Sequence, residues 1–386
     1  MSKTRPNLSL ALKENEIKAQ TRDRRIQLFH KINFERDIKA DTKKLLKALN
    51  SSLDAGNNLK TRKLAVTEVE RLGFLLFNAI FQVSSIRVGG GFLDELLSEL
   101  IIEASSKPLE IKIDGDWYAL PWELLRMPKG FAGLKNDVFL GEIAIIASDF
   151  KVEDDTMNVC RVIDKLQIVS VAGNKRLSYA REEINFIKSL NSENLRPLRV
   201  LSEFPTSRKA EVSHTNYDRF IEGINSPFPA NLLHGAFHSN TPNGESTFEI
   251  TVDKNAKLVS QGFMINGKRP LGAHIAFFNT CQGIATGEWF GGGIGRYALQ
   301  RWGSHPVITS IAKINDNDAS IFSNIFLKEI LPMTTDYGLP VGVSLLKARN
   351  EWLKREGPEK LLGLSYRILG NPRRYFKVVR EAENAA

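Results

Sequence analysis

Two short apolar segments each end near a side chain that could take part in nucleophilic catalysis. The segment 232–239 (LLHGAFHS) carries His234 and His238, and the segment 275–280 (IAFFNT) is followed at once by Cys281. A cysteine thiol titrates near pH ~8.5, so at neutral pH it needs a neighbouring base, most often a histidine, to become a thiolate. A Cys–His pair of this kind indicates covalent catalysis, as in the hydrolysis of peptide bonds.

These two segments belong to an alternation of strand and helix patterns that begins near residue 165. Further strands are predicted from the short apolar runs 166–172, 198–201 and 307–311. Because a helical pattern follows each strand, the sequence predicts an α/β fold with a mostly parallel sheet and helices on both faces. Functional groups in such sheets gather beyond the carboxyl ends of the strands, so we expect His238 and Cys281 at one edge.

The two histidines of segment 232–239 are predicted to differ in role. Side chains alternate along a strand, so His234 and His238 share one face. We predict a structural role for His234, because it lies deeper in the strand than His238, which stands at the exposed tip. The acidic pair Glu182 and Glu183 is expected in the first turn of a helix that begins near residue 178, where carboxylates favour the helix dipole.

Residues 1–105 are predicted to form a helical region ahead of an α/β domain at 106–386. Apolar residues recur at helical spacing in 38–53 and 66–80, and a third helix is expected over 92–104. The segment 109–113 then alternates apolar and polar residues and is followed by Asp-Gly, which predicts a strand and a hairpin.

Composition limits the class of protein. Hydrophobic residues make up 42% and charged residues 25% of 386 residues, which is ordinary for a globular protein with a core. The most apolar stretch, 72–81, is too short to span a bilayer, and no secretory signal is expected. Two cysteines cannot form a disulfide framework and fit a reducing cytoplasm. Neither Cys-x-x-Cys nor His-Glu-x-x-His spacing occurs, so we expect no metal and no cofactor.

The positive charge is concentrated near the start of the chain. The net charge is +9, and residues 1–50 hold 13 Lys and Arg against 6 Asp and Glu. A basic arm of this kind could bind nucleic acid or an acidic protein partner. The simpler interpretation, which we favour, is a solvated and partly disordered terminus.

The motifs together resemble the CHAT family, which belongs to the caspase–separase clan of cysteine proteases. His-x-Ala-x-His at 234–238 and Thr-Cys-x-Gly at 280–283 resemble the two catalytic signatures of that family. Four more segments match the family pattern in the same order: 120–125 (LPWELL), 166–184, 307–318 and 365–372. The resemblance covers residues 109–376 and implies a caspase-like fold.

The resemblance also implies the roles of individual residues. By position, Cys281 is the nucleophile and His238 its base or ion-pair partner, and the backbone N–H groups of Cys281 and Ser239 would hold the oxyanion. Many relatives have glycine where Ser239 stands. Relatives in this clan select the residue before the scissile bond with a charged pocket, and Asp316 or Asp318 would there select Lys or Arg. The alternative for these two residues is helix capping.

The implied function is a cysteine endopeptidase that cuts protein substrates at few sites and is gated by a protein activator or regulatory partner. CHAT proteins are frequent in bacterial antiviral defence. The alternative is a catalytically silent scaffold that assembles partners through the basic helical N-terminal region. Nucleic-acid binding is expected only through residues 1–50, where charge is the sole signal, and no membrane partner is expected.

Overall fold

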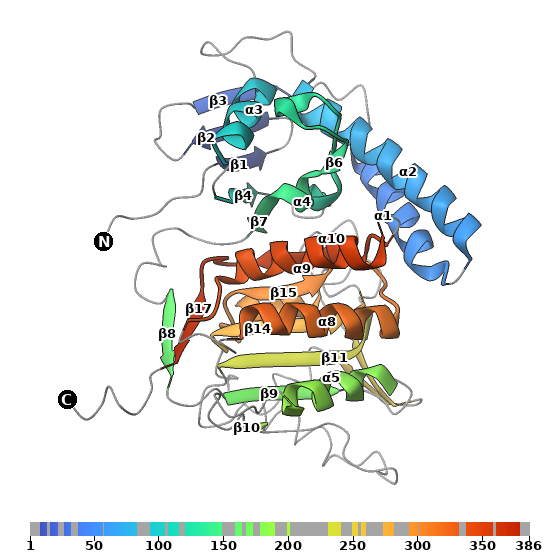
Figure 1. Cartoon of the computed structure of the whole chain (residues 1–386), viewed down its shortest axis with the longest axis vertical. Coiled ribbons are helices and arrows are strands. Elements are labelled where there is room, and N and C mark those ends of the chain that lie inside the picture. The colour runs from blue at the N-terminus through green and yellow to red at the C-terminus, as the bar shows by residue number, and fades with distance from the viewer. Residues whose placement is uncertain are drawn as a thin grey trace, which may run out of the picture. The chain divides into compact units, whose positions relative to one another are not determined.

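The computed structural model describes most of the chain and divides it into two compact units. The described residues are 8–13, 16–21, 27–31, 38–56, 58–82, 93–104, 107–115, 120–148, 159–163, 167–172, 178–189, 199–200, 231–240, 249–253, 256–259, 273–281, 293–300, 302–331, 337–357 and 360–378. The first unit contains residues 1–156 and 349–367, and the second contains residues 157–348 and 368–386. Many of the helices and strands are labelled in Figure 1.

The first unit contains a mixed sheet built largely from the start of the chain. Its strands are β1 (Leu8–Lys13), β2 (Glu16–Thr21), β3 (Gln27–Lys31), β4 (Leu109–Gly115) and β7 (Ala144–Ser148). β1 pairs in parallel with β4, and β4 pairs in parallel with β7. β2 pairs antiparallel with both β1 and β3. The strand predicted over 109–113 is therefore confirmed, but the hairpin after it is wrong, because both neighbours of β4 run parallel to it.

The helical prediction for residues 1–105 is wrong for the described segments 8–13, 16–21 and 27–31, which are strands. Leu8, Leu10, Ile17 and Ala19 are fully buried, and their spacing of two residues is that of a strand with one face in the core. The interpretation of this terminus as a solvated arm is wrong for β1 and β2 for the same reason. Since β1 pairs with β4, the division of the structure also does not coincide with the boundary predicted at residue 105.

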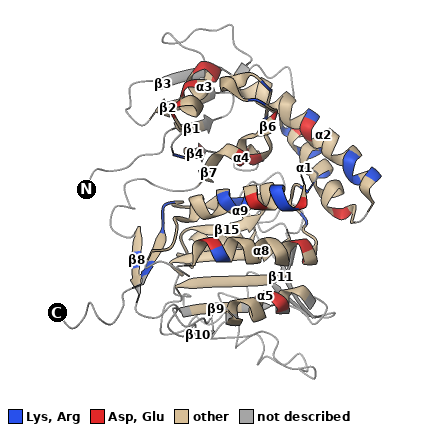
Figure 2. Cartoon of the chain, in the orientation of Figure 1, with Lys and Arg blue, Asp and Glu red and all other residues tan. Residues whose placement is uncertain are grey.

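Three helices of the first unit confirm the rest of the helical prediction. They are α1 (Ile38–Asp54), α2 (Leu59–Phe77), which continues into the π-helical η1 (Asn78–Gln82), and α3 (Leu93–Glu103). The side chain of Asn58 caps α2 by accepting a hydrogen bond from the backbone N of Thr61 at 3.1 Å. Lys39, Lys43 and Lys47 are exposed on α1, so part of the basic charge of residues 1–50 lies on the outer face of a packed helix (Figure 2).

Short elements complete the first unit. They are η3 (Trp122–Leu124), β5 (Arg126–Met127), η4 (Phe131–Gly133), β6 (Val138–Phe139), α4 (Leu140–Ile143) and α10 (Leu362–Ser365). η3 lies within the segment 120–125 and approaches α2 so closely that a side chain at Gly73 would collide with the carbonyl oxygen of Leu124.

A charged cluster is buried in the core of the first unit. The carboxylate of Glu123 accepts hydrogen bonds from Arg367 at 3.2 Å and 2.7 Å. Arg349 lies 3.7 Å from the same carboxylate and donates to the carbonyl oxygen of Gly363 at 3.2 Å. The exposed fractions of the three charged side chains are 0% for Glu123, 1% for Arg349 and 2% for Arg367. Burial lowers the pKa of Arg349 to about 10, while Glu123 raises it and Arg367 lowers it further.

The second unit contains a parallel sheet that confirms the α/β prediction. Its strands, in spatial order, are β10 (Arg199–Val200), β9 (Gln167–Ala172), β11 (Leu232–Asn240), β14 (Ile275–Thr280) and β15 (Val307–Ser310), and each neighbouring pair is parallel. All five were expected from the apolar runs. The helix expected between 201 and 231 lies outside the described residues.

Helices cover both faces of this sheet. α5 (Ser178–Ser189) and α8 (Asp316–Ile330) pack against each other and lie on the same face. Successive residues of β14 point to opposite faces: Phe277 contacts Phe326 of α8, whereas Phe278 contacts Trp302, just after α7 (Ile294–Gln300).

The remaining elements include strands that extend the parallel sheet and a separate two-stranded sheet. They are β8 (Cys160–Ile163), β12 (Glu249–Asp253), β13 (Ala256–Val259), α9 (Val341–Glu356), β16 (Tyr366–Leu369) and β17 (Tyr375–Val378). β12 pairs antiparallel with the end of β11 and with β13, and β8 pairs in parallel with β17. Among the helices of the described residues, none has the length and apolar character needed to cross a bilayer.

Candidate active site

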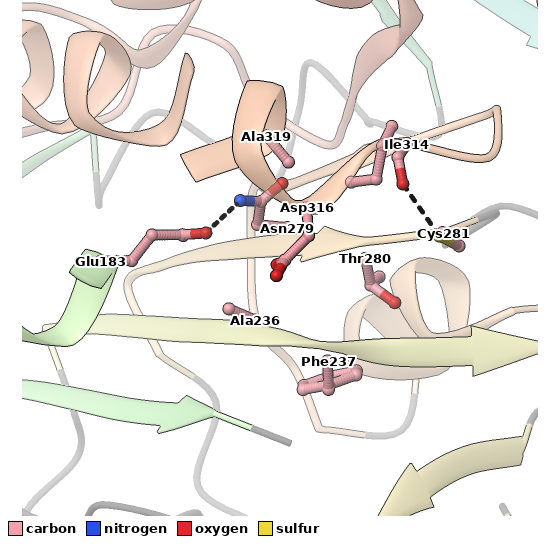
Figure 3. A pocket seen from close by; sticks show the side chains of 9 residues that line it. All are labelled: Glu183, Ala236, Phe237, Asn279, Thr280, Cys281, Ile314, Asp316 and Ala319. Carbon is pink, nitrogen blue, oxygen red and sulfur yellow. Dashed lines mark hydrogen bonds between the residues drawn. The ribbon is translucent and has the colours of Figure 1, made fainter. Parts of the chain in front are cut away.

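Cys281 directly follows β14, at the carboxyl end of the parallel sheet. It is partly exposed, and its thiol donates a hydrogen bond to the carbonyl oxygen of Ile314 at 3.6 Å. It lines a pocket that is open to solvent, and the empty space of about 280 Å³ at this site includes part of that solvent. The other lining residues are Glu183, Ala236, Phe237, Asn279, Thr280, Ile314, Asp316 and Ala319 (Figure 3). This is the edge of the sheet at which functional groups were expected.

His238 lies on β11, the strand next to β14, at the position opposite Cys281. Phe237 of β11 is aligned with Thr280 of β14, so His238 and Cys281 are each the next residue after an aligned pair. Adjacent strands lie about 4.8 Å apart, and the two backbones are therefore neighbours at one edge. The side chains of His238 and Ser239 lie outside the described part of the structure, so the dyad and the oxyanion site stay predictions.

Ser239 belongs to an extended strand. β11 continues to Asn240, and Ser239 is aligned with Ile250 of β12. The sequence predicted that His238 stands at the exposed tip of this strand. The antiparallel partner β12 prolongs the strand, because it supplies backbone hydrogen-bond partners beyond the parallel sheet.

His234 is completely buried and both of its ring nitrogens have partners. Nε2 lies 2.9 Å from Oε2 of Glu183, and Nδ1 lies 2.8 Å from Oγ of Ser170. Oε1 of Glu183 in turn accepts a hydrogen bond from the amide nitrogen of Asn279 at 2.6 Å. Buried polar groups need partners of this kind. His234 therefore occupies the structural position predicted for it, and its ring nitrogens are engaged within the fold.

The position of Glu183 differs from the prediction. α5 begins at Ser178, so Glu183 lies in its second turn, and the side chain is 1% exposed rather than placed at the helix terminus. Its neighbours Ala180, Ile184 and Ile187 are also buried, which makes Glu183 an inward-facing member of the apolar stripe. Glu183, Ile184 and Ile187 follow Ala180 by three, four and seven residues, the spacing of one helix face, and this spacing could have indicated that Glu183 faces inward. The polar side chains His234 and Asn279 on the facing strands were a second signal.

Asp316 and Asp318 have different surroundings at the start of α8. The N-cap is Asn315, whose side chain accepts hydrogen bonds from the backbone N of Asn317 at 3.0 Å and of Asp318 at 3.4 Å. Neither aspartate is thus the cap. Asp316 lines the pocket beside Cys281, whereas Asp318 is not one of the lining residues.

The carboxylate of Asp316 is partly buried in the pocket. Burial raises its pKa to about 6; a hydrogen bond at 3.4 Å from the backbone N of Tyr179 opposes the shift, and the charges of Glu183 and Glu182 add to it. The pocket therefore combines a thiol with two carboxyl side chains and is suited to a cationic group. Within the described ranges, no three His, Cys, Asp or Glu side chains gather closely enough to hold a metal ion.

Comparison with known proteins shows similarity at the level of the fold. The sequence matches no protein-family model and no curated protein. The structure resembles separase in the Saccharomyces cerevisiae separase–securin complex, with a TM-score of 0.56 and 12% identity over 96% of this chain and 30% of that chain. It resembles the Arg-specific cysteine proteinase gingipain R more weakly, with a TM-score of 0.45 and 10% identity over 76% of this chain and 70% of that chain.

The likeness to separase confirms the fold predicted from the sequence, a mixed α/β fold of the caspase type with a mostly parallel sheet flanked by helices. The chain spans about 30% of the length of the separase chain that it matches.

Proposed function

We propose that this protein is a cysteine endopeptidase of the CHAT type, with Cys281 as nucleophile and His238 as its base. The observation that carries the proposal is the placement of Cys281 in a pocket at the carboxyl end of β14, beside the strand that bears His238. The separase-like fold supports it.

The proposed chemistry has two steps. The thiolate of Cys281 attacks the carbonyl carbon of the scissile bond, and the backbone N–H groups of Cys281 and Ser239 hold the oxyanion. The C–N bond breaks as His238 gives its proton to the leaving amine, which leaves a thioester. Water, deprotonated by His238, then attacks the thioester. The C–S bond breaks, the new carboxyl terminus leaves, and His238 returns a proton to the sulfur.

The substrate class that we propose is a protein with Arg or Lys before the scissile bond. Asp316 lies in the same pocket as Cys281 and presents a carboxylate to it, whereas Asp318 does not line the pocket. A charge-assisted hydrogen bond from the substrate cation to Asp316 supports the choice of this residue.

A protein partner is proposed to regulate the activity. The separase with a similar fold was solved in complex with securin, and an unregulated endopeptidase would damage its cell. A role in bacterial antiviral defence is part of the CHAT proposal, as is a cytoplasmic location.

Covalent labelling tests the proposed activity. An acyloxymethyl ketone carrying Arg or Lys is expected to add one mass equivalent to the full-length protein, because a thiolate displaces the acyloxy group. Peptide mapping is expected to find the adduct on Cys281, with Cys160 as the internal control. Failure to label Cys281, in the isolated chain and beside the products of neighbouring genes, would contradict the protease and favour a silent scaffold.

Asp316→Asn is expected to lower kcat/KM for peptides with Arg or Lys before the scissile bond about 10- to 100-fold, the value of a lost hydrogen bond to a charged group. For the wild type, kcat/KM for these peptides should fall as pH drops through about 6, because protonation of Asp316 removes its charge. In Asp316→Asn this fall of kcat/KM near pH 6 should be absent. Asp318→Asn, which makes the same change outside the pocket, provides the comparison. An equal loss in both variants would remove the assignment.

A further inference from the structure

Cys281 shares its pocket with two carboxyl side chains. Glu183 is nearly fully buried, and its two oxygens are held by Asn279 and His234. Asp316 comes from a different helix and opens onto the same space, as Figure 3 shows. A negative charge in the same pocket disfavours the ionisation of a thiol, because the thiolate would be a further negative charge beside it. The two carboxylates thus oppose the ionisation that the proposed nucleophile requires.

The hydrogen bond of Cys281 acts in the same direction. Its sulfur donates to the carbonyl oxygen of Ile314 at 3.6 Å. A carbonyl oxygen only accepts hydrogen bonds, so the protonated thiol can make this contact and the thiolate cannot. Ile314 immediately precedes the Asn315–Asp316 start of α8. The carbonyl acceptor and one of the two carboxylates therefore come from the same short segment.

We propose that a guanidinium or ammonium group entering this pocket converts Cys281 from thiol to thiolate, so that the nucleophile is activated by the charged side chain of its own substrate. The inference rests on the proposed preference for a basic residue and adds a regulatory consequence to it. A cation between the carboxylates offsets their field at the sulfur, and the released proton passes to His238, which later gives it to the leaving amine. Opposite charges within about 4–6 Å shift such equilibria by one to three pH units. The thiolate fraction at fixed pH should then rise about 10- to 1,000-fold.

This arrangement predicts where selectivity appears in the kinetics. A cation that only anchors the substrate would lower KM, whereas a cation that also generates the thiolate raises kcat. Peptides with a neutral isostere of arginine are therefore expected to lose kcat as well as affinity.

Alkylation of the full-length protein by iodoacetamide measures the thiolate without any substrate. The probe is n-propylguanidine, with the uncharged isostere n-propylurea as the matched compound. At pH 7 the guanidine is expected to accelerate alkylation of Cys281 at least tenfold and saturably, and to lower the pH at half-maximal rate. The urea should have no such effect, and Cys160, followed in the same peptide maps, should react at an unchanged rate. Unchanged or slower alkylation of Cys281 with the guanidine would overturn the inference.

Charge-removing variants locate the effect. In Asp316→Asn, Cys281 is expected to be alkylated faster than in the wild type without any ligand. The guanidine should accelerate this alkylation less than it does in the wild type. Glu183→Gln should show the same two changes. Asp318→Asn, which removes a carboxylate of α8 that does not line the pocket, is the control and should match the wild type. Because Glu183 is held in a buried network, its variant can fail to fold, and Asp316→Asn then decides alone. If Cys281 of Asp316→Asn were alkylated at the wild-type rate, both with and without the guanidine, the inference would be contradicted.

The two proposals fail in different ways. Peptide cleavage without acceleration by the guanidine would leave the protease standing and remove the cation switch. Acceleration of Cys281 alkylation without labelling or cleavage would keep the switch and remove the protease.

Discussion

Replacing Cys281 by alanine is expected to abolish peptide cleavage, and replacing His238 by alanine to lower kcat/KM about 10²- to 10⁴-fold. The first change removes the atom that forms the thioester, and the second removes the group that accepts and returns the proton, whose contribution is typically of this size. The measurement is cleavage of fluorogenic peptides with Arg or Lys before the scissile bond, with the activating partner present if one is required.

Cys160 offers the matched control for this pair of variants. It is the second cysteine of the chain and lies in β8. Cys160→Ala should retain the wild-type kcat/KM. A His238→Ala protein that still folds and keeps the wild-type rate would show that another group serves as the base.

Replacing Glu123 by glutamine is expected to destabilise the protein by about 3–5 kcal/mol, the usual cost of removing one partner from a buried ion pair. Arg367 would lose its carboxylate while remaining 2% exposed, and the charge of Arg349 beside it would lose its compensation. At about 2–4 °C per kcal/mol, the melting temperature of the first unit should fall by about 10 °C in scanning calorimetry.

Glu70→Gln is the control for this stability prediction. Glu70 pairs with Arg126 at 3.0 Å in the same unit, but its side chain is 39% exposed. Surface pairs contribute about 0–1 kcal/mol, so this variant should melt within a few degrees of the wild type. Equal losses in the two variants would mean that burial of the cluster does not determine its contribution.

The parallel sheet of the second unit could be predicted from the sequence, because its strands are short apolar runs that a local sequence pattern reveals. The strands β1–β3 were not predicted. The high charge of this segment predicted a solvated arm. Ile17 and Ala19 nevertheless alternate with polar residues, which is the pattern of a strand with one buried face. The hairpin after 113 was also wrong, because the partners of β4 are far away in the sequence and a turn signal is local.

The candidate site could be predicted only in part. Cys281 was placed correctly at a strand end, since strand order and direction follow from the α/β pattern. Glu183 was missed as a partner of His234, because a contact across 51 residues depends on how a helix lies on the sheet. The choice between Asp316 and Asp318 required the same information, namely which face of α8 borders the pocket.

One segment of the first unit follows most of the second unit in the sequence. Glu123 meets Arg367 across 244 residues of sequence, and residues 349–367 belong to the first unit although the second unit lies between. A ribosome therefore releases the body of the first unit with a buried carboxylate that has no guanidinium beside it. Only when residue 367 emerges is the pair formed. The first unit is thus completed only after residues 157–348 of the second unit have been synthesised, and a chain that stops before residue 367 lacks the charge that this core requires.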